Sequence, residues 1–578
     1  MISINPKIQA WLEGPYDEKT KEEIRSLLKN NPKKLDDAFF ADLEFGTGGL
    51  RGLMGVGTNR FNVYTVRQTT QGLANYLLKQ KAPLRVVIGY DSRHNSRLFA
   101  EETARVLAGN GISVLLLKEL RPTPYVSFAV RAKKCLCGIM ITASHNPAEY
   151  NGYKVFWSDG AQVVPPHDTG IMNEVKSVKD IRQVKLSELN SKLIETVDEG
   201  LDQDYLDAIR PLEFFPEQNR THGKKLKICY TPLHGTGQTI VPKALIDWGF
   251  SSIAYVEEQI KPDGSFPTVK FPNPEFKETL TLGIALLKKS GGDILIANDP
   301  DADRTGLVVT HKGEPVILNG NEIGALCTHF ICETLKKQHK LPKNGAFVTT
   351  IVSTELIKAI ASTYGSLCIE VLTGFKYIGE KIHEWEQSPN SPQFLFGAEE
   401  SYGYLLGTVS RDKDAMISSC LISEMALDAK LQNMTLVDRL HALYKQHGLF
   451  RERQYSADFA SGKEEMKQVE TIMGNLRKNP PEQIAGQNVI LVEDYLTRTR
   501  KDLVTQKETP LTLPKSNVLL FRLADESKLI LRPSGTEPKI KLYCSVRLKK
   551  FSSIEEGITT CEKQLDTLIA SFKQIAGI

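Results

Sequence analysis

Short β-rich runs that alternate with amphipathic stretches constrain the fold of this chain more than any other feature. Residues 85–89 (RVVIG), 113–117 (SVLLL) and 138–142 (GIMIT) have the composition of buried strands. Residues 65–80 and 97–110, which lie around the first of these runs, have apolar positions at helical spacing. Alternation of this kind predicts α/β units with largely parallel or mixed sheets.

The same alternation starts again twice further along the chain. A second series of strands is predicted at residues 226–230, 253–256 and 293–297, and a third at residues 346–350 and 394–397. Each series is long enough for a domain of its own. The sequence therefore predicts three α/β segments in succession.

The C-terminal segment has a different pattern. Residues 518–522 and 528–532 predict a hairpin, and residues 539–545 predict a further strand. Residues 554–575 repeat apolar side chains at steps of three and four, which is typical of a helix with one buried face. This segment is predicted to be an α+β domain.

At 578 residues the chain is too long for a single hydrophobic core. Polar, proline-bearing stretches near residues 210, 319 and 450 are the best candidates for boundaries. Four domains are predicted: residues 1–210, 211–320, 321–450 and 451–578. In the same order, they carry the serine loop, the acidic loop, the glutamate loop and the arginine loop that are described below.

The composition argues against several classes of function. A net charge of +4 is nearly neutral for this size, so strong nucleic-acid or membrane-surface binding is not expected. The nine cysteines lack the spacing of a zinc site or a disulfide framework, and Cys135 and Cys137 fit two thiols on a buried strand. Without a membrane-length apolar run or a secretory leader, the expected compartment is the cytoplasm.

A candidate nucleophile follows the predicted strand at residues 138–142 directly. Ser144 lies in the segment TASHNP, at the carboxyl end of a strand, where α/β sheets present ligands. An Asn151-Gly152 turn is predicted to shape the loop, and Lys154 is placed to return to it. With His145 as a base and Lys154 as a positive charge, the segment suits phosphoryl acceptance. An ordinary turn is the alternative.

A candidate metal site follows the predicted strand at residues 293–297. Asp299, Asp301 and Asp303 alternate with other residues, so an extended segment would place all three on one side. Oxygen ligands at this density favour Mg²⁺ or Ca²⁺ over zinc. Arg304 is placed either to buttress the aspartates or to contact a transferred phosphoryl group. A solvated acidic turn is the alternative.

Other loops offer groups for a sugar and a phosphate. Glu399 and Ser401 are predicted to share one side of an extended segment, and Lys376 follows a glycine turn. The segment RPSGTEP combines a guanidinium, hydroxyl groups and a glycine, which is typical of an anion nest. The glycine-rich segment at residues 46–52 is not a dinucleotide-binding fingerprint, and no P-loop is present. Nucleotide-dependent phosphoryl transfer is therefore disfavoured.

Four motifs occur in a fixed order, one in each predicted domain: TASHNP with the downstream Lys154, DPDADR, GAEES and RPSGTEP. On these motifs the chain resembles the α-D-phosphohexomutase family, in particular its phosphoglucomutase/phosphomannomutase group. The resemblance extends from the GTGGLRG segment to the terminal helix. It implies an α/β fold of three similar domains with mixed sheets, plus a smaller C-terminal α+β domain, around a central cleft.

The resemblance also implies a role for the residues of each motif. The catalytic residues that it implies are Ser144, His145, Lys154, Arg51, Arg304 and Lys376. The implied ligands of one Mg²⁺ per chain are Ser144, Asp299, Asp301 and Asp303. The implied substrate-binding residues are Glu399, Ser401, Arg532, Ser534, Gly535 and Thr536. Arg411 and Lys413 resemble a further stretch near the phosphate.

The implied reaction interconverts glucose 1-phosphate and glucose 6-phosphate through a phosphoserine, with glucose 1,6-bisphosphate as intermediate and activator. Phosphomannomutase and phosphopentomutase activities are alternatives, because the GFKYIG and EESYGY loops also lie near those of enzymes that act on pentose phosphates. A phosphoserine-using sugar phosphatase and a catalytically silent sugar-phosphate-binding protein are alternatives from other classes. Small sugar phosphates are the expected partners of a monomer or dimer.

Overall fold

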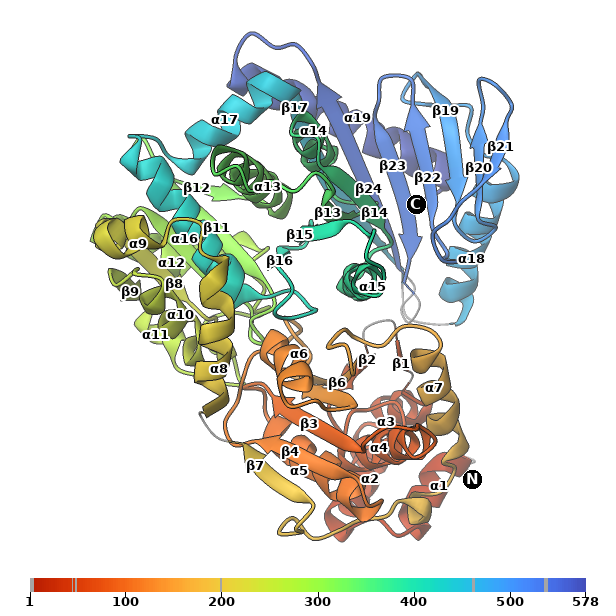
Figure 1. Ribbon diagram of the computed structural model, residues 1–578. Coiled ribbons are helices and arrows are strands. Elements are labelled where there is room, and N and C mark those ends of the chain that lie inside the picture. The colour runs from red at the N-terminus through yellow and green to blue at the C-terminus, as the bar shows by residue number, and fades with distance from the viewer. Residues whose placement is uncertain (1–4, 44, 47–48, 198–199, 460–462, 535–538) are drawn as a thin grey trace. The chain divides into compact units, whose positions relative to one another are not determined.

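The computed structural model describes residues 5–43, 45–46, 49–197, 200–459, 463–534 and 539–578 (Figure 1). The chain divides into two compact units. The first unit consists of Met1–Ile323, Asn344–Ala346 and Gly374–Thr435. The second consists of Gly324–Lys343, Phe347–Thr373 and Leu436–Ile578.

A mixed seven-stranded sheet forms the N-terminal part of the first unit. Its strands are β1 Phe45–Gly46, β2 Gly49–Leu53, β3 Arg85–Tyr90, β4 Ser113–Leu117, β5 Cys137–Ile141, β6 Tyr150–Trp157 and β7 Ile194–Val197. Their order is β1-β2-β6-β5-β3-β4-β7. Strands β5, β3, β4 and β7 run parallel, while β6, β2 and β1 are antiparallel additions. The three strands predicted here are confirmed to within one residue.

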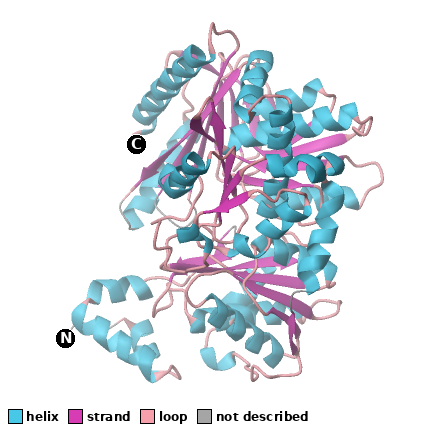
Figure 2. Ribbon diagram, turned by 90° about the vertical axis from the view of Figure 1, so that its left-hand side faces the viewer, coloured by secondary structure: helices cyan, strands magenta, loops and turns pink. Residues whose placement is uncertain are grey.

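Helices cover both faces of this sheet (Figure 2). They are α4 Val63–Leu77, α5 Ser96–Gly109, α6 Thr123–Ala132 and α7 His167–Ser177, and α4 and α5 confirm the two predicted helices. On one face, Ile88 shares a core with Leu73 and Phe99. On the other face, a Cβ at Gly138 would lie 2.4 Å from the Val130 side chain. Glycine therefore allows α6 to lie directly on the strands.

Three helices precede this sheet and were not anticipated from the sequence. They are α1 Pro6–Glu13, α2 Glu18–Asn30 and α3 Pro32–Phe39. The Trp11 ring stacks on Tyr16 at 4.3 Å and meets Phe39 and Tyr64 edge-on. Because Tyr64 belongs to α4, this aromatic cluster fixes the three helices to the first sheet's own helical layer.

A five-stranded sheet follows in the first unit. Its strands are β8 Ile228–Thr231, β9 Ile253–Tyr255, β10 Ile294–Asn298, β11 Thr305–His311 and β12 Glu314–Leu318, in the order β12-β11-β10-β8-β9. Strands β10, β8 and β9 are parallel, and β11 and β12 are antiparallel additions. The helices of this part are α8 Gly200–Ile209, α9 Pro216–His222, α10 Val241–Asp247, α11 Glu257–Ile260 and α12 Thr281–Ser290.

The first unit is completed by an antiparallel pair of strands and two helices. These are α15 Phe375–Glu386, β15 Gln393–Glu399, β16 Gly403–Leu406 and α16 Ala415–Leu431. Nearly every residue of α16 is buried, so this helix forms part of the core. The chain passes between the two units in α13 Gly320–Lys337 and β13 Gly345–Thr350, and α14 Glu355–Thr363 and β14 Leu367–Val371 belong to the second unit.

The second unit contains an antiparallel sheet. Its strands are β17 Leu449–Asp458, β18 Gln483–Ile484, β19 Gln487–Asp494, β20 Thr499–Asp502, β21 Glu508–Pro510, β22 Leu519–Leu523, β23 Lys528–Pro533 and β24 Lys539–Leu548. Its helices are α17 Leu436–His447, α18 Lys463–Lys478 and α19 Ile554–Ala576. The predicted hairpin, strand and closing helix correspond to β22, β23, β24 and α19 and are confirmed. Within the part of the chain described, no helix has the length and apolar character needed to cross a membrane.

Candidate active site

Ser144 lies in a tight turn at the carboxyl end of β5. The amide of Asn146 donates to the carbonyl oxygen of Ala143 at 3.1 Å, which closes the turn. Ser144 has a φ of 52°, in the left-handed region that is unfavourable for a residue with a side chain. Its side chain is nevertheless buried, with a relative exposure of 3%. Burial and strain of this kind favour a functional loop over the ordinary turn that is the alternative interpretation.

The Ser144 hydroxyl group has two polar neighbours. It donates a hydrogen bond of 2.9 Å to Oδ2 of Asp299 and lies 3.1 Å from Nδ1 of His145. Burial, together with the positive charges of Arg304 and Arg51, lowers the pKa of His145 well below its usual value of 6.5. His145 is therefore a neutral imidazole at physiological pH, and its ring nitrogen faces the serine.

The predicted turn at Asn151-Gly152 is wrong, because both residues lie inside β6. This strand pairs antiparallel with β5, so that Lys154 stands opposite Met140. A Cβ at Gly152 would lie 2.5 Å from the carbonyl oxygen of Thr142, so the glycine serves close strand packing and not a turn. The strand nevertheless brings Lys154 back beside the serine loop, as the sequence predicts.

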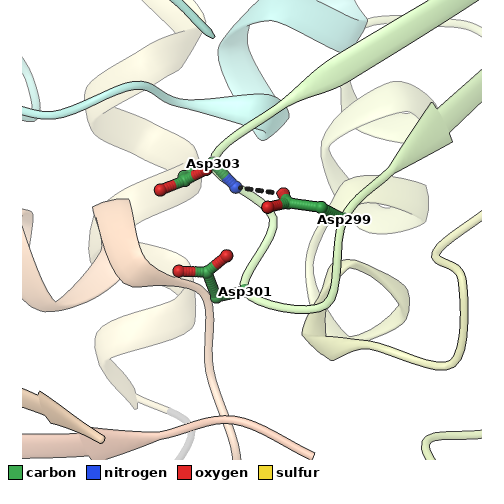
Figure 3. Close-up of side chains that lie close together, drawn as sticks. All are labelled: Asp299, Asp301 and Asp303. Atoms are coloured by element: carbon green, nitrogen blue, oxygen red, sulfur yellow. Dashed lines mark hydrogen bonds between the residues drawn. The ribbon is translucent and has the colours of Figure 1, made fainter. Parts of the chain in front are cut away.

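The three aspartates lie in the loop between β10 and β11 (Figure 3). The predicted extended segment is wrong: the amide of Ala302 donates to the carbonyl oxygen of Asp299 at 2.9 Å, and Ala302 has a φ of 48°. Oδ1 of Asp299 accepts hydrogen bonds from the amides of Asp303 and Arg304, each at 3.0 Å. A turn, and not strand alternation, therefore brings one oxygen of Asp299, Asp301 and Asp303 within 4.8 Å of the others.

Two buried lysines lie against the aspartates. Nζ of Lys154 is 2.8 Å from Oδ2 of Asp301 and 3.1 Å from Oδ2 of Asp303, and Nζ of Lys413 is 3.2 Å from the same oxygen of Asp303. Burial opposes the charge on Lys154, but the two aspartates outweigh it and raise the pKa of this lysine. Burial opposes the charge on Asp303 as well, and Lys413 and Lys154 lower its pKa below the usual value.

Asp299 differs from the other two aspartates. Burial, with Asp303 and Asp301 adding repulsion, raises the pKa of Asp299 well above 3.8. Oδ1 of Asp301 and Oδ1 of Asp303 are buried and have no hydrogen-bond partner among the described residues. Such oxygens are costly unless a cation or water binds them. The clustered carboxylate oxygens therefore fit a hard divalent cation such as Mg²⁺.

Two arginines lie beside the serine and aspartate loops. Nε of Arg304 is 4.0 Å from both Asp299 and Asp303, and its Nη1 is 3.4 Å from Glu275. Arg304 thus buttresses the aspartates, which is one of the two roles left open by the sequence. Arg51, on β2, donates a hydrogen bond of 3.0 Å to the Asn146 side chain in the serine loop.

The predicted sugar-binding residues come from two adjoining elements. Glu399 is the last residue of β15 and Ser401 lies in the following turn, so the two do not alternate along one strand. Glu399 is buried, which raises its pKa, and it accepts the amide of Gly374 at 2.9 Å. Nζ of Lys376, in the first turn of α15, lies 3.6 Å from Asp168, and burial lowers the pKa of this lysine.

The predicted phosphate loop belongs to the second unit. Arg532 lies near the end of β23, and the amide of Ser534 donates to the carbonyl oxygen of Lys539 at 2.8 Å across the base of the loop. Gly535 and Thr536 lie outside the described residues. The assignment of these four residues to a phosphate site stays a prediction.

One residue at the aspartate loop has no motif in the sequence. Thr123, in the first turn of α6, donates its hydroxyl to Oδ2 of Asp301 at 2.7 Å and its amide to the Asp301 carbonyl oxygen at 2.8 Å. Its place after β4, another strand end, is the only signal that sequence reasoning offers. Of the two residues in the RDKDA stretch, Lys413 reaches the aspartates, whereas Arg411 is paired with Glu386.

Three family models match the chain. They are described as phosphoglucomutase/phosphomannomutase, alpha/beta/alpha domains I, II and III, and match residues 42–182, 203–313 and 319–447. A phosphoglucomutase of Staphylococcus aureus (strain MSSA476) is 38% identical over 560 residues, which cover 95% of this chain and 97% of that protein.

Solved structures share the fold. A putative phosphomannomutase from Thermus thermophilus aligns with a TM-score of 0.68 at 21% identity, covering 93% of this chain and 100% of that one. The open form of parafusin, a phosphoglucomutase from Paramecium, aligns with a TM-score of 0.68 at 18% identity, covering 93% and 96%.

Three α/β/α domains with mixed sheets and an antiparallel C-terminal domain define a multidomain α/β protein of the phosphosugar-mutase type. The chain belongs to the phosphoglucomutase/phosphomannomutase family, as its ordered motifs indicate.

Proposed function

We propose that this chain interconverts glucose 1-phosphate and glucose 6-phosphate, as an isomerase-class intramolecular phosphotransferase in which Ser144 carries the phosphoryl group. The hydrogen bond of 2.9 Å between the buried Ser144 hydroxyl and Asp299 carries this proposal, because the hydroxyl of the proposed phosphoryl carrier lies against a carboxylate cluster whose geometry suits a cation. The name of the Staphylococcus aureus relative supports glucose as the sugar.

The reaction has two half-reactions. In the first, the bond from phosphorus to Oγ of Ser144 breaks, phosphorus bonds to O6 of glucose 1-phosphate, and the O6 proton passes to a base. The bisphosphate then turns end for end. In the second, the bond from phosphorus to O1 breaks, phosphorus returns to Oγ, and O1 takes up the proton. No water or nucleotide is consumed, and glucose 1,6-bisphosphate recharges Ser144 when its phosphoryl group is lost.

Residues of the chain itself supply the groups for proton transfer and most of the positive charge around the phosphoryl group. The lowered pKa of Lys376, caused by burial, suits it to accept the O6 proton as a neutral amine. Arg51 and Arg304 would stabilise the phosphoryl group, and Lys154 lines the same site. His145 offers a neutral nitrogen to Oγ. The pre-arranged charges lower the barrier without reorganising in the transition state.

Asp299, Asp301 and Asp303 would hold one Mg²⁺ per chain, with the oxygen on Ser144 as a further ligand. Bound Mg²⁺ offsets the negative charge of the phosphoryl group. The buried Oδ1 atoms of Asp301 and Asp303, which have no hydrogen-bond partner in the part of the chain that the structure describes, support this assignment.

Substrate binding is assigned to two further loops. Glu399 and Ser401 would hydrogen-bond to vicinal hydroxyls of the sugar. Arg532, Ser534, Gly535 and Thr536 would hold the distal phosphate, which is bound but not attacked. We place these loops in domains at residues 321–450 and 451–578, after domains at residues 1–210 and 211–320. The ranges matched by the three family models support these boundaries.

Small sugar phosphates are the proposed ligands, and the cytoplasm is the proposed compartment. All nine cysteines are free thiols, and all but Cys368 are buried. Free thiols without a disulfide framework fit a reducing environment.

A coupled assay tests the activity. Glucose 1-phosphate, Mg²⁺ and a trace of glucose 1,6-bisphosphate are incubated with the protein, and glucose 6-phosphate and inorganic phosphate are followed together. We expect glucose 6-phosphate alone. Inorganic phosphate released at the turnover rate would identify a phosphatase, and no product from any sugar phosphate would leave a binding protein. Mannose 1-phosphate and ribose 1-phosphate in parallel test the sugar.

Intact mass tests the carrier. The intact mass of the Ser144→Ala variant should lack one phosphoryl group, and this variant should have no activity. The Ser177→Ala variant, changed at an exposed serine, should keep both the phosphoryl group and the activity. Equal labelling of the two variants would place the nucleophile elsewhere.

A further inference from the structure

Arg93 is a buried arginine beside the serine loop that none of the roles above uses. It follows β3, and its side chain has 0% exposure. Nη1 donates to the carbonyl oxygens of Pro147 at 2.7 Å and Tyr150 at 3.0 Å. Nη2 donates to the carbonyl oxygens of Ser144 at 2.6 Å and Asn146. One guanidinium group therefore ties together four carbonyls, three in the loop after β5 and one at the first residue of β6.

Asp91 completes the connection from the other side of Ser144. Its Oδ2 accepts the hydroxyl of Thr142 at 2.6 Å and lies 3.4 Å from Nε of Arg93. Its Oδ1 accepts the hydroxyl of Ser96 at 2.7 Å. The Thr142 hydroxyl oxygen in turn accepts the amide of Ser144 at 2.8 Å. Both the amide and the carbonyl of Ser144 are thus held, one through Thr142 and Asp91 and the other by Arg93.

A loop after α11 covers this arrangement. The ring of Phe266 lies over the Arg93 guanidinium, 4.9 Å from its central carbon. A Cβ at Gly264 would lie 2.5 Å from the amide nitrogen of His94, so this loop is in direct backbone contact with the segment after β3. Nε2 of His94 lies 2.8 Å from the Ser265 hydroxyl. We call Arg93, Asp91 and the groups that they bind the clamp. The side chains of Arg93 and Asp91 are shielded from solvent, and hydrogen bonds are strongest in such buried surroundings.

The backbone of Ser144 explains why such a clamp is needed. A non-glycine residue at a φ of 52° relaxes unless its surroundings over-determine it. Relaxation would move the hydroxyl away from Asp299. We propose that Arg93 and Asp91 are positioning residues that lock the Ser144 backbone in the left-handed region and so aim Oγ at the aspartate loop. This inference rests on the proposed function, since it assumes that Oγ is the phosphoryl carrier.

Arg93→Lys tests the clamp. Lysine keeps the charge, but a single ammonium cannot span four carbonyls as a planar guanidinium does. We expect kcat to fall about 100-fold, the effect of displacing a reacting group by roughly 1 Å. The KM for glucose 1-phosphate should change less than about threefold, because the sugar and phosphate loops are untouched. Arg67→Lys, at a half-buried ion pair with Glu102, is the matched control and should keep kcat.

Thr142 provides a second test that does not depend on Arg93 variants folding. Thr142→Val keeps the shape but removes the acceptor for the Ser144 amide, whereas Thr142→Ser keeps the hydroxyl. We expect kcat to fall at least about tenfold in Thr142→Val and to be restored in Thr142→Ser, with the rate at which glucose 1,6-bisphosphate phosphorylates Ser144 following the same order.

Two outcomes would overturn the clamp: Arg93→Lys with the same kcat as Arg67→Lys, whether both are reduced or neither is, or Thr142→Val as active as Thr142→Ser. A wild-type protein inactive on every sugar phosphate would refute the proposed function instead. In that case a crystal structure of Arg93→Lys decides the clamp alone, because Ser144 should leave the left-handed region, and an unchanged φ would contradict us.

Discussion

The ammonium group of Lys154 lies 2.8 Å from Oδ2 of Asp301, although 147 residues separate the two along the chain. The pair joins the strand that returns from the serine loop to the loop that carries the aspartates. Both side chains are almost fully buried. The electrostatics of the site therefore depend on contacts between two different sheets.

Removing the ammonium group of Lys154 from this pair should impair both activity and stability. In Lys154→Met we expect kcat to fall about 10² to 10³-fold, as when one pre-arranged charge is lost from a transition state. Without Mg²⁺, the buried carboxylates left behind should lower the free energy of unfolding by about 3–5 kcal/mol. Saturating Mg²⁺ should recover part of that loss. Thermal unfolding with and without Mg²⁺ measures it, and the exposed Lys118→Met is the control. Equal melting temperatures in the two variants would contradict the prediction.

Chelation should abolish turnover, and Mg²⁺ should restore it. Mg²⁺ at 100 times its dissociation constant should stabilise the wild type by about 2.7 kcal/mol, because it binds only the folded site. Asp301→Asn replaces a charged oxygen donor, so its Mg²⁺ titration should shift to higher concentration. Asp36→Asn, on the surface of α3, should titrate like the wild type. Retention of full activity after exhaustive chelation would exclude the aspartates as an essential metal site.

The pH dependence of kcat should report on Lys376. Burial lowers the pKa of this lysine, and the nearby Asp168 carboxylate opposes the shift by stabilising the charged form. Because the neutral amine is the proposed base, activity should rise with pH through the pKa of Lys376. Asp168→Asn removes the stabilising charge and so lowers the pKa of Lys376 further. The rising limb of the plot of kcat against pH should therefore move to lower pH.

The control for the pH profile is Asp159→Asn. Asp159 is in the same part of the chain and does not pair with Lys376 among the contacts described. If the rising limb of the pH profile moves to higher pH in Asp168→Asn, or moves equally in both variants, Lys376 is not the base in proton transfer.

The close contact between α6 and the first sheet should make Gly138 intolerant of a side chain. A Cβ there would lie 2.4 Å from Val130, so Gly138→Ala should destabilise the first unit by about 1–3 kcal/mol. At Gly474 in α18 an added Cβ would meet no described atom within 4 Å beyond its chain neighbours and the backbone of its own helix, and Gly474→Ala should be stabilising by about 0.4–1 kcal/mol. Urea unfolding of both variants gives the comparison, and a neutral Gly138→Ala would mean that α6 moves away.

Local patterns were enough to find the strands and the loops that follow them. The strand before Ser144 and the strand before Asp299 each read as an apolar run ending in polar residues, so their carboxyl ends could be placed within one residue. Both loops then lie at sheet edges, where ligands bind. For the same reason α19 could be located, because its buried residues recur at helical spacing.

The conformation of those loops could not be predicted in the same way. The three aspartates meet because of a turn at Ala302, while alternation in the sequence suggested an extended segment. Asn151-Gly152 reads as a turn, yet packing against the Thr142 carbonyl places the pair in a strand. In the first case a local turn, and in the second a contact with another strand, replaces the conformation that the sequence pattern suggests.

Contacts made by residues outside any recognisable motif could not be predicted from the sequence either. Thr123 and Arg93 carry no motif, and their partners lie 178 and 51 to 57 residues away in sequence. A threonine or an arginine after a strand is common, and only the folded chain shows which carbonyl or carboxylate it faces. The three N-terminal helices were also missed, because their packing depends on contacts with Val56 and Tyr64 further along the chain.

The pairing of β5 with β6 sets a rule for the number of residues in the paired part of β6. Lys154 stands opposite Met140 and is an even number of residues from the first residue of β6, Tyr150, so its side chain lies on the same face of the sheet as that of Tyr150. One residue inserted ahead of Lys154 inside the paired segment would turn its side chain to the opposite face of the sheet, whereas two would restore it. Length variation within β6 ahead of the lysine is therefore restricted by parity, and the count of residues from the start of this strand to the lysine is itself a diagnostic for related sequences.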